Sequence, residues 1–152
     1  MESSFHYLMM VNHLRFYKSA YSKLEGTGLT FGQPKVLEYI CIHSGCLQKD
    51  IAKGYCIEPA TVTSLLLRME AQGLITRVCD NDKRSHRVFP TEKGVAMNQL
   101  ICQAFKDTEK LAFNGFSEEE ILLFSQMQKR INENLCNISD KKQITEERKK
   151  KR

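Results

Sequence analysis

The chain has 152 residues, of which 41% are hydrophobic and 27% charged, and its formal net charge is +5. This length and composition fit one compact domain with a hydrophobic core, and they exclude a largely disordered chain. No apolar run is long enough to span a membrane, and the N-terminus lacks the basic lead and small-residue cleavage site of a signal peptide, so we expect a cytoplasmic protein.

The N-terminal part of the sequence shows helical periodicity. Apolar residues at spacings of three and four predict a helix over residues 5–24, and the glycines of segment 25–28 are suited to end it. A second helix is expected over residues 31–43, with Thr30 as its N-cap. Pro34 would lie in the first turn of this helix, where a missing N–H does no harm.

Two short helices follow, and together they indicate a helix-turn-helix. The first is predicted over residues 47–55 and is too short to be stable alone. The second is predicted over residues 58–73, with Pro59 at its first position and Gly73 as its stop. Its expected buried face consists of Val62, Leu65, Leu66 and Met69.

The sequence period then changes from that of a helix to that of a strand. Residues 74–79 and 87–89 read as two strands, and the highly charged segment between them reads as a hairpin loop. Pro90 ends the second strand and lacks a backbone donor, which favours an edge strand. A hairpin directly after a helix-turn-helix is typical of a wing.

Two longer helices are predicted in the C-terminal part. One should cover residues 91–112. Ser117 and Glu120 have the spacing of a capping box and should open a last helix over residues 118–136. The remaining polar residues, 138–152, are expected to be frayed or disordered.

Several short motifs in the segment 47–94 occur in an order and spacing that point to one family. They are Gln48-Lys49-Asp50-Ile51-Ala52, Ala60-Thr61-Val62-Thr63, Met69-Glu70-Ala71-Gln72-Gly73-Leu74-Ile75, Asp82-Lys83-Arg84-Ser85 and Thr91-Glu92-Lys93-Gly94. On these motifs the chain resembles the MarR family of winged-helix transcription regulators, over roughly residues 5–136.

The resemblance implies a mainly α fold with a small β-wing, in which the N- and C-terminal helices form a homodimer. Residues 1–30 and 113–137 would be the dimerisation helices, and residues 31–112 the winged helix-turn-helix with its connecting long helix. Residues 138–152 would form a basic, disordered tail. The implied function is that of a sequence-specific repressor, which binds a pseudo-palindromic operator and is released by a small-molecule effector.

The residue types on the expected DNA surface match this function. Small hydroxyls and methyls can approach base edges, an arginine can reach guanine or phosphate, and basic side chains can contact phosphates. We expect the helix-turn-helix to contribute Gln48, Lys49, Pro59, Ala60, Thr61, Thr63, Ser64 and Arg68, and the wing to contribute Asp82, Lys83, Arg84, His86 and Arg87. Unspecific attraction would come from the mildly basic charge balance.

The signal to which the regulator responds is less defined by the sequence. His13, Phe16 and Tyr17 are candidates for contacts with a small-molecule effector in a cleft between the dimer helices and the DNA-binding lobe. The six cysteines form no CxxC pair, and Cys41, Cys79 and Cys102 lie in apolar runs that favour burial.

The sequence supports other functions less strongly. A thiol-responsive regulator and a winged helix that binds protein instead of DNA remain alternatives, the latter hinted at by Leu65 and Leu67. The four histidines are dispersed, so we expect no metal site. No nucleophile elbow, P-loop, zinc-protease motif or dinucleotide-binding turn occurs, so we expect neither an enzyme nor a cofactor.

Arg84 at the hairpin tip provides the first testable prediction. A narrow minor groove attracts a guanidinium group, and Asp82 is placed in the sequence to orient it. We expect Arg84→Ala to reduce operator affinity by about tenfold or more while folding is unchanged. Binding titrations together with a thermal unfolding curve check this, and unchanged affinity would contradict the assignment of the wing.

Overall fold

The computed structural model describes residues 4–79 and 86–150, with side chains from 4 to 79 and from 86 to 136. The chain forms two compact units, residues 1–112 and 113–152, which are described separately below. None of the helices in the described ranges has an apolar stretch long enough to cross a lipid bilayer.

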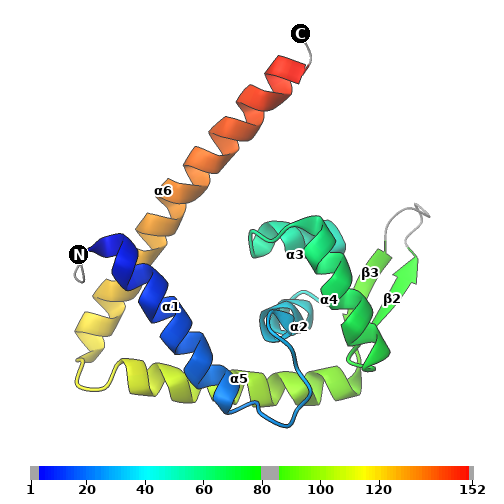
Figure 1. Ribbon diagram of the computed structural model, residues 1–152, viewed down its shortest axis with the longest axis horizontal. Helices are drawn as coiled ribbons and strands as arrows, with labels where there is room; N and C mark the ends of the chain where they lie inside the picture. Colours follow the sequence, from blue (N-terminus) through cyan, green and yellow to red (C-terminus); the bar gives the residue numbers. More distant parts are fainter. Residues whose placement is uncertain (1–3, 80–85, 151–152) are drawn as a thin grey trace. The chain divides into compact units, whose positions relative to one another are not determined.

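The first unit contains all elements of the predicted winged helix-turn-helix (Figure 1). In chain order they are α1 (Phe5–Ser22), α2 (Gln33–Ile42), β1 (Cys46–Leu47), α3 (Gln48–Gly54), α4 (Pro59–Ala71), β2 (Ile75–Cys79), β3 (His86–Pro90) and α5 (Glu92–Ala112). Helix α2 packs against α3, α4 and α5 and therefore lies at the centre of the unit, while α1 packs against α5.

The hydrophobic core lies where α2, α4 and α5 meet. Its largest fully buried side chains include Leu37 and Ile40 of α2, Leu66 and Met69 of α4, and Ile101 of α5. All four residues predicted for the buried face of α4 are buried. This burial fixes which side of α4 remains on the surface, and so which side chains can meet a partner.

The β-sheet has three antiparallel strands in the order β1-β3-β2. Strand β3 is therefore the central strand, so the edge position predicted from Pro90 is wrong. The proline is tolerated because β1 pairs only with residues 87 and 88, and Pro90 lies beyond its reach. Two-residue strand β1 was missed because so short a strand has no detectable period.

Helix α2 begins later than the sequence predicted. Its N-cap is Gly32 with φ of 90°, a conformation that favours glycine, and Thr30 is therefore not the cap. Instead, the backbone N–H of Thr30 donates to Oε1 of Gln33, which is fully buried. The prediction failed because the buried side chain of Gln33, in the first turn of α2, accepts the backbone N–H of Thr30.

The second unit consists of the segment from Phe113 and helix α6 (Glu118–Lys150). The predicted capping box is confirmed, because Glu120 N–H donates to Ser117 Oγ (3.2 Å) and Ser117 N–H donates to Glu120 Oε2 (2.8 Å). The predicted end at residue 136 and the frayed tail beyond it are wrong, since α6 continues to Lys150. The added segment has no glycine or proline and is rich in lysine, glutamate and arginine, which favour helix.

The Thr-Glu-Lys-Gly motif joins the end of α4 to the start of α5. Thr91 Oγ1 donates to the Gly73 carbonyl (2.7 Å), and Thr91 N–H donates to the Leu74 carbonyl (3.0 Å). The same hydroxyl oxygen accepts from Gly94 N–H (3.0 Å). This motif therefore has a structural role in positioning α4.

Gly94 is the most constrained residue of this junction. A Cβ atom at this position would lie 2.0 Å from the Leu74 carbonyl oxygen, which belongs to the backbone and cannot rotate away. Glycine to alanine usually stabilises a helix by about 1 kcal/mol. We expect the opposite sign here, with Gly94→Ala losing about 1–3 kcal/mol of unfolding free energy through the steric conflict. Urea denaturation measures this difference, and an equal or higher stability would show that the junction is not tightly packed.

Candidate nucleic-acid interface

The solvent-facing side of α4 contains most of the residues predicted to contact DNA. Pro59, Ala60, Thr61, Ser64 and Arg68 are exposed, and Thr63 is partly exposed. The side chain of Arg68 makes no hydrogen bond or ion pair with any described residue, which leaves its guanidinium available. This face is therefore polar and carries small side chains near the N-terminus of the helix.

Leu67 also lies on this face, at 51% exposure, whereas its neighbour Leu65 is buried. The protein-binding alternative drew on both leucines, and only Leu67 remains available on the surface. A single exposed leucine is common on protein surfaces and does not form an apolar binding face.

Two hydroxyl groups on α4, those of Thr63 and Ser64, donate to the helix backbone. Thr63 Oγ1 donates to the Pro59 carbonyl (2.9 Å), and Ser64 Oγ donates to the Ala60 carbonyl (3.1 Å). Because the hydroxyl hydrogens are used in this way, Ser64 faces solvent as an acceptor. Acceptors in the major groove match the amino groups of adenine and cytosine.

Gln48 connects the two helices of the helix-turn-helix. Its side-chain Nε2 donates to Thr63 Oγ1 and, at 3.4 Å, to the Pro59 carbonyl. Both partners lie in the first turns of α4, so the amide group holds the start of α3 against α4. The start of α3 is further supported by Asp50, whose carboxylate accepts the N–H of Leu47 at 3.0 Å. Lys49, also predicted to contact phosphates, is exposed on α3.

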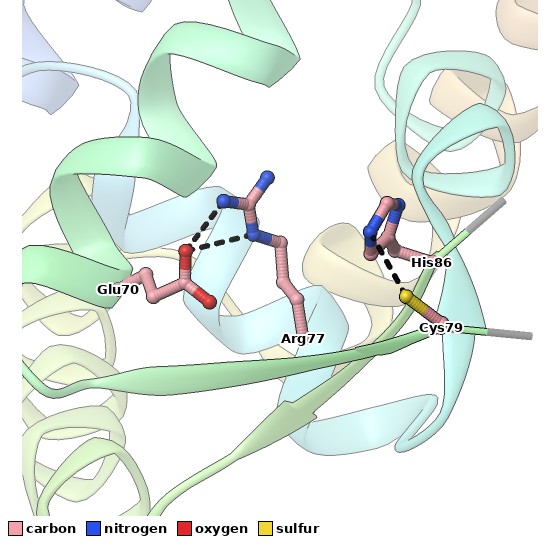
Figure 2. A network of polar contacts seen from close by, with 4 residues as sticks. All are labelled: Glu70, Arg77, Cys79 and His86. Atoms are coloured by element: carbon pink, nitrogen blue, oxygen red, sulfur yellow. Dashed lines mark hydrogen bonds and ion pairs between the residues drawn. The ribbon is translucent and has the colours of Figure 1, made fainter. Parts of the chain in front are cut away.

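An ion pair joins the wing to α4. Arg77 of β2 donates through Nε (2.9 Å) and Nη2 to the same oxygen, Oε2, of Glu70 near the end of α4 (Figure 2). The hydrogen bonds and charge of Arg77 lower the pKa of Glu70, against a smaller opposing effect of desolvation. This pair was not predicted from the sequence, although opposite charges on a helix end and on the strand that follows are a recognisable signal.

The outer ends of β2 and β3 carry Cys79 and His86, which face each other across the strand pair (Figure 2). The distance from Cys79 Sγ to His86 Nε2 is 3.6 Å, and both side chains are exposed. Cys79 was predicted to be buried, and this is wrong because it lies beyond the part of β2 that the core covers. Cys41 and Cys102 are partly buried.

The remaining wing residues divide into two groups. Arg87 is exposed and donates from Nη1 to the Gly45 carbonyl (3.1 Å), so its guanidinium is held beside the turn before β1. Asp82, Lys83 and Arg84 lie outside the described residues. The described parts of the predicted interface thus come from α3, α4 and β3, and the tip of the wing keeps its predicted role as a hypothesis.

The three candidate effector contacts lie together on α1. The ring centroids of His13 and Tyr17 are 4.7 Å apart, and those of Phe16 and Tyr17 are 6.3 Å apart. Phe105 of α5 stacks on Phe16 at 6.1 Å. Among the described side chains, no group of three histidine, cysteine, aspartate or glutamate residues is arranged to hold a metal ion.

Comparison with known proteins gives one consistent result. Residues 27–85 match the model of the MarR family. The chain is 29% identical over 108 residues to the uncharacterised HTH-type transcriptional regulator YybA of Bacillus subtilis (strain 168), which covers 70% of this chain and 72% of the relative.

Several solved structures have a similar fold. A putative MarR family regulator from Listeria monocytogenes, complexed with a 26mer DNA, superposes with a TM-score of 0.80 at 26% identity, covering 90% of this chain and 91% of that one. The S. aureus MepR–DNA complex has a TM-score of 0.73 at 29% identity, with 90% and 98% of the two chains covered. SlyA has a TM-score of 0.76 at 28% identity, with 84% and 90% covered.

The Glu70–Arg77 ion pair predicts a pH dependence of stability. Because the folded-state pKa of Glu70 is below its ordinary value, the contribution of the pair is present above that value, 4.5, and is lost as the pH falls through the folded pKa. More than one third of the Glu70 side chain is exposed, so we expect only about 0.2–1 kcal/mol.

Urea denaturation of Glu70→Gln and of the unaltered chain at pH 7 and pH 3 tests this expectation. The variant should be less stable at pH 7, and the difference should shrink at pH 3. The same substitution at exposed Glu25 serves as the control for loss of a surface charge. A difference between Glu70→Gln and the unaltered chain that is constant with pH would count against the ion pair.

Proposed function

We propose that the chain is a winged-helix transcriptional regulator of the MarR type, a repressor that binds a pseudo-palindromic DNA operator as a homodimer and is released by a small molecule. The observation that carries the proposal is the surface of α4. Its exposed face combines small side chains, an acceptor hydroxyl and the exposed Arg68, and Gln48 of α3 and Arg77 of β2 are hydrogen-bonded to α4.

DNA binding is supported by the geometry of the first unit and by its relatives. A recognition helix must present its N-terminal residues to base edges while other elements contact the backbone. Thr61 and Ser64 lie in the first two turns of α4, and we assign phosphate contacts to the exposed Lys49 of α3 and Arg87 of β3. Two family members with similar structures have been solved in complex with DNA.

A homodimer is supported by exposed apolar side chains at both ends of the chain. On α1, Phe5 is 60% and Leu14 is 64% exposed, and on α6, Leu122 is 61% exposed. Large apolar residues in such numbers on a helix indicate a surface that is covered in the functional state. The further members of these two surfaces are Leu8, Met9, Met10, Leu123, Phe124, Met127 and Leu135. The same helices in a second copy would provide the cover.

Release by a small molecule is supported by the aromatic residues of α1. Tyr17 makes ring contacts with His13 and Phe16, and Phe16 and Tyr17 each contact Phe105 of α5. Such clusters offer large apolar contact area and defined ring geometry to a ligand. We assign the effector contacts to this region, between the N-terminal helix and the DNA-binding elements.

The proposal predicts sequence-specific binding that weakens with salt. A labelled duplex from the intergenic region upstream of the gene should bind the purified full chain in the presence of excess unrelated DNA. The logarithm of the association constant should fall linearly with the logarithm of salt concentration, by roughly 0.9 for each phosphate contacted. A footprint of two half-sites would identify a dimeric complex. If excess unrelated DNA abolished binding to the labelled duplex, this would argue against specific binding of the protein to an operator in that duplex.

Two variants sharpen this experiment. Arg68→Ala should reduce operator affinity by about tenfold, since a good arginine contact to a base contributes roughly 1–3 kcal/mol. Lys106→Ala removes an exposed positive charge from α5 and should leave the affinity unchanged. Equal effects of the two variants would mean that α4 is not the recognition helix.

A further inference from the structure

The ring contacts around Tyr17 extend beyond the three residues already assigned to the effector. Its centroid lies 5.9 Å from that of Tyr21, 5.8 Å from Phe31 and 6.2 Å from Phe105. With His13 and Phe16 these residues form what we call the aromatic cluster. It joins α1, the segment between α1 and α2, and α5.

The cluster is ordered and is also open to solvent. Phe31 is 68% exposed although its ring stacks on Tyr21 at 5.6 Å, and Tyr17 and Tyr21 are half-buried. The Tyr21 hydroxyl accepts the N–H of Gly32 at 2.9 Å, which fixes the segment that carries Phe31. A ligand can therefore meet aromatic faces that are already in position.

A carboxylate without a positive partner among the described residues, that of Glu38, interacts electrostatically with Tyr17 of the cluster. Glu38 of α2 is half-buried, and no lysine, arginine or histidine nitrogen of the described residues forms an ion pair with it. Desolvation raises the pKa of Glu38, and the negative charge of Glu109 on α5 raises it further. Glu38 in turn raises the pKa of Tyr17, after the larger effect of burial. The site thus combines aromatic faces with uncompensated negative charge.

The nearest lysine on the same helix is engaged elsewhere. Lys35 lies one turn before Glu38, and its ammonium group is 5.7 Å from the centre of the Tyr55 ring. Burial, with the charge of Glu38 as the next cause, raises the pKa of Tyr55 to about 12. The face of Tyr55 is therefore occupied by the ammonium group of Lys35. Among the described residues, no lysine or arginine lies over a ring of the aromatic cluster.

We propose that this site takes an organic cation with aromatic or apolar groups, bound between the aromatic cluster and Glu38. The proposal rests on the proposed function, because it names the class of the effector. A positive charge gains from the ring faces and from the carboxylate together. An organic anion of the same size would be repelled by Glu38 and Glu109, and a neutral ligand would leave the half-buried carboxylate uncompensated.

The segment that carries Phe31 is connected to the recognition helix by hydrogen bonds. Gln33, buried at the start of α2, donates from Nε2 to Oε1 of Gln72 (2.9 Å), and Gln72 at the C-cap of α4 donates back to the Gly28 carbonyl (3.0 Å). A ligand that displaces Phe31 therefore acts on residues that hold the end of α4. This connection gives the binding site a route to DNA affinity.

The test uses two ions of matched size and shape and opposite charge, tetraphenylphosphonium and tetraphenylborate. Isothermal titration of each into the full chain without DNA measures affinity, and titration into the protein–DNA complex measures release. The phosphonium should bind about tenfold or more tightly than the borate and should displace DNA. Glu38→Gln should remove most of this preference, whereas Glu25→Gln, at an exposed site outside the cluster, should retain it.

The outcomes separate the two proposals. Tighter binding of the borate, equal binding of both ions, or the same preference in Glu38→Gln and Glu25→Gln would overturn the assignment of a cationic ligand. Phosphonium binding that leaves the DNA complex intact would overturn its role as effector. Failure of the unliganded chain to bind operator DNA contradicts the proposed function instead, because ion binding is measured on the chain without DNA.

Discussion

The last turn of α4 is hydrogen-bonded to three other parts of the first unit, and the position of the recognition helix depends on these bonds. Backbone carbonyls at a helix C-terminus have no partner within the helix. Here the Gln72 carbonyl accepts from Lys93 of α5 (2.7 Å), and the Gly73 carbonyl accepts from Thr91 (2.7 Å), the residue just before α5. The positive charge of Lys93 at this end is also favoured by the helix dipole. The side chain of Gln72 adds the bond to the segment before α2.

Much of this architecture follows from patterns that the sequence contains. The period of the apolar residues located α1 to α5, and the burial of Leu66 and Met69 confirms the predicted inner face of α4. Short sequence motifs predicted helix ends correctly where a single local interaction forms the end, as in the reciprocal hydrogen bonds of Ser117 and Glu120 at the start of α6. They failed at Pro90, whose place in the sheet depends on a two-residue strand far away in the sequence.

The candidate site was predictable in its residue types and much less so in its connections. Exposure of Ser64 and Arg68 follows from helical periodicity, since the opposite face of α4 is apolar. The bond from Gln48 to Thr63 and the ion pair between Glu70 and Arg77 depend on how helices and strands pack. Cys79 illustrates the same limit, because an apolar run predicts burial only as far as the core extends along the strand. Pair contacts of this kind require a tertiary structure.

The polar bonds at the end of α4 also link this helix to the proposed effector site. Glu70 is bonded to Arg77 of the wing, whereas Gln72, two residues later, is bonded to Gln33 of α2 and to the Gly28 carbonyl in the segment next to the aromatic cluster. Polar contacts have directional geometry, so a small displacement of either partner weakens them more than it weakens apolar packing. The inner face of α4 is held by apolar side chains that tolerate small shifts of the helix end. A change near Phe31 can therefore alter the orientation of α4 without unfolding the core, which is what the proposed release of DNA by an effector requires.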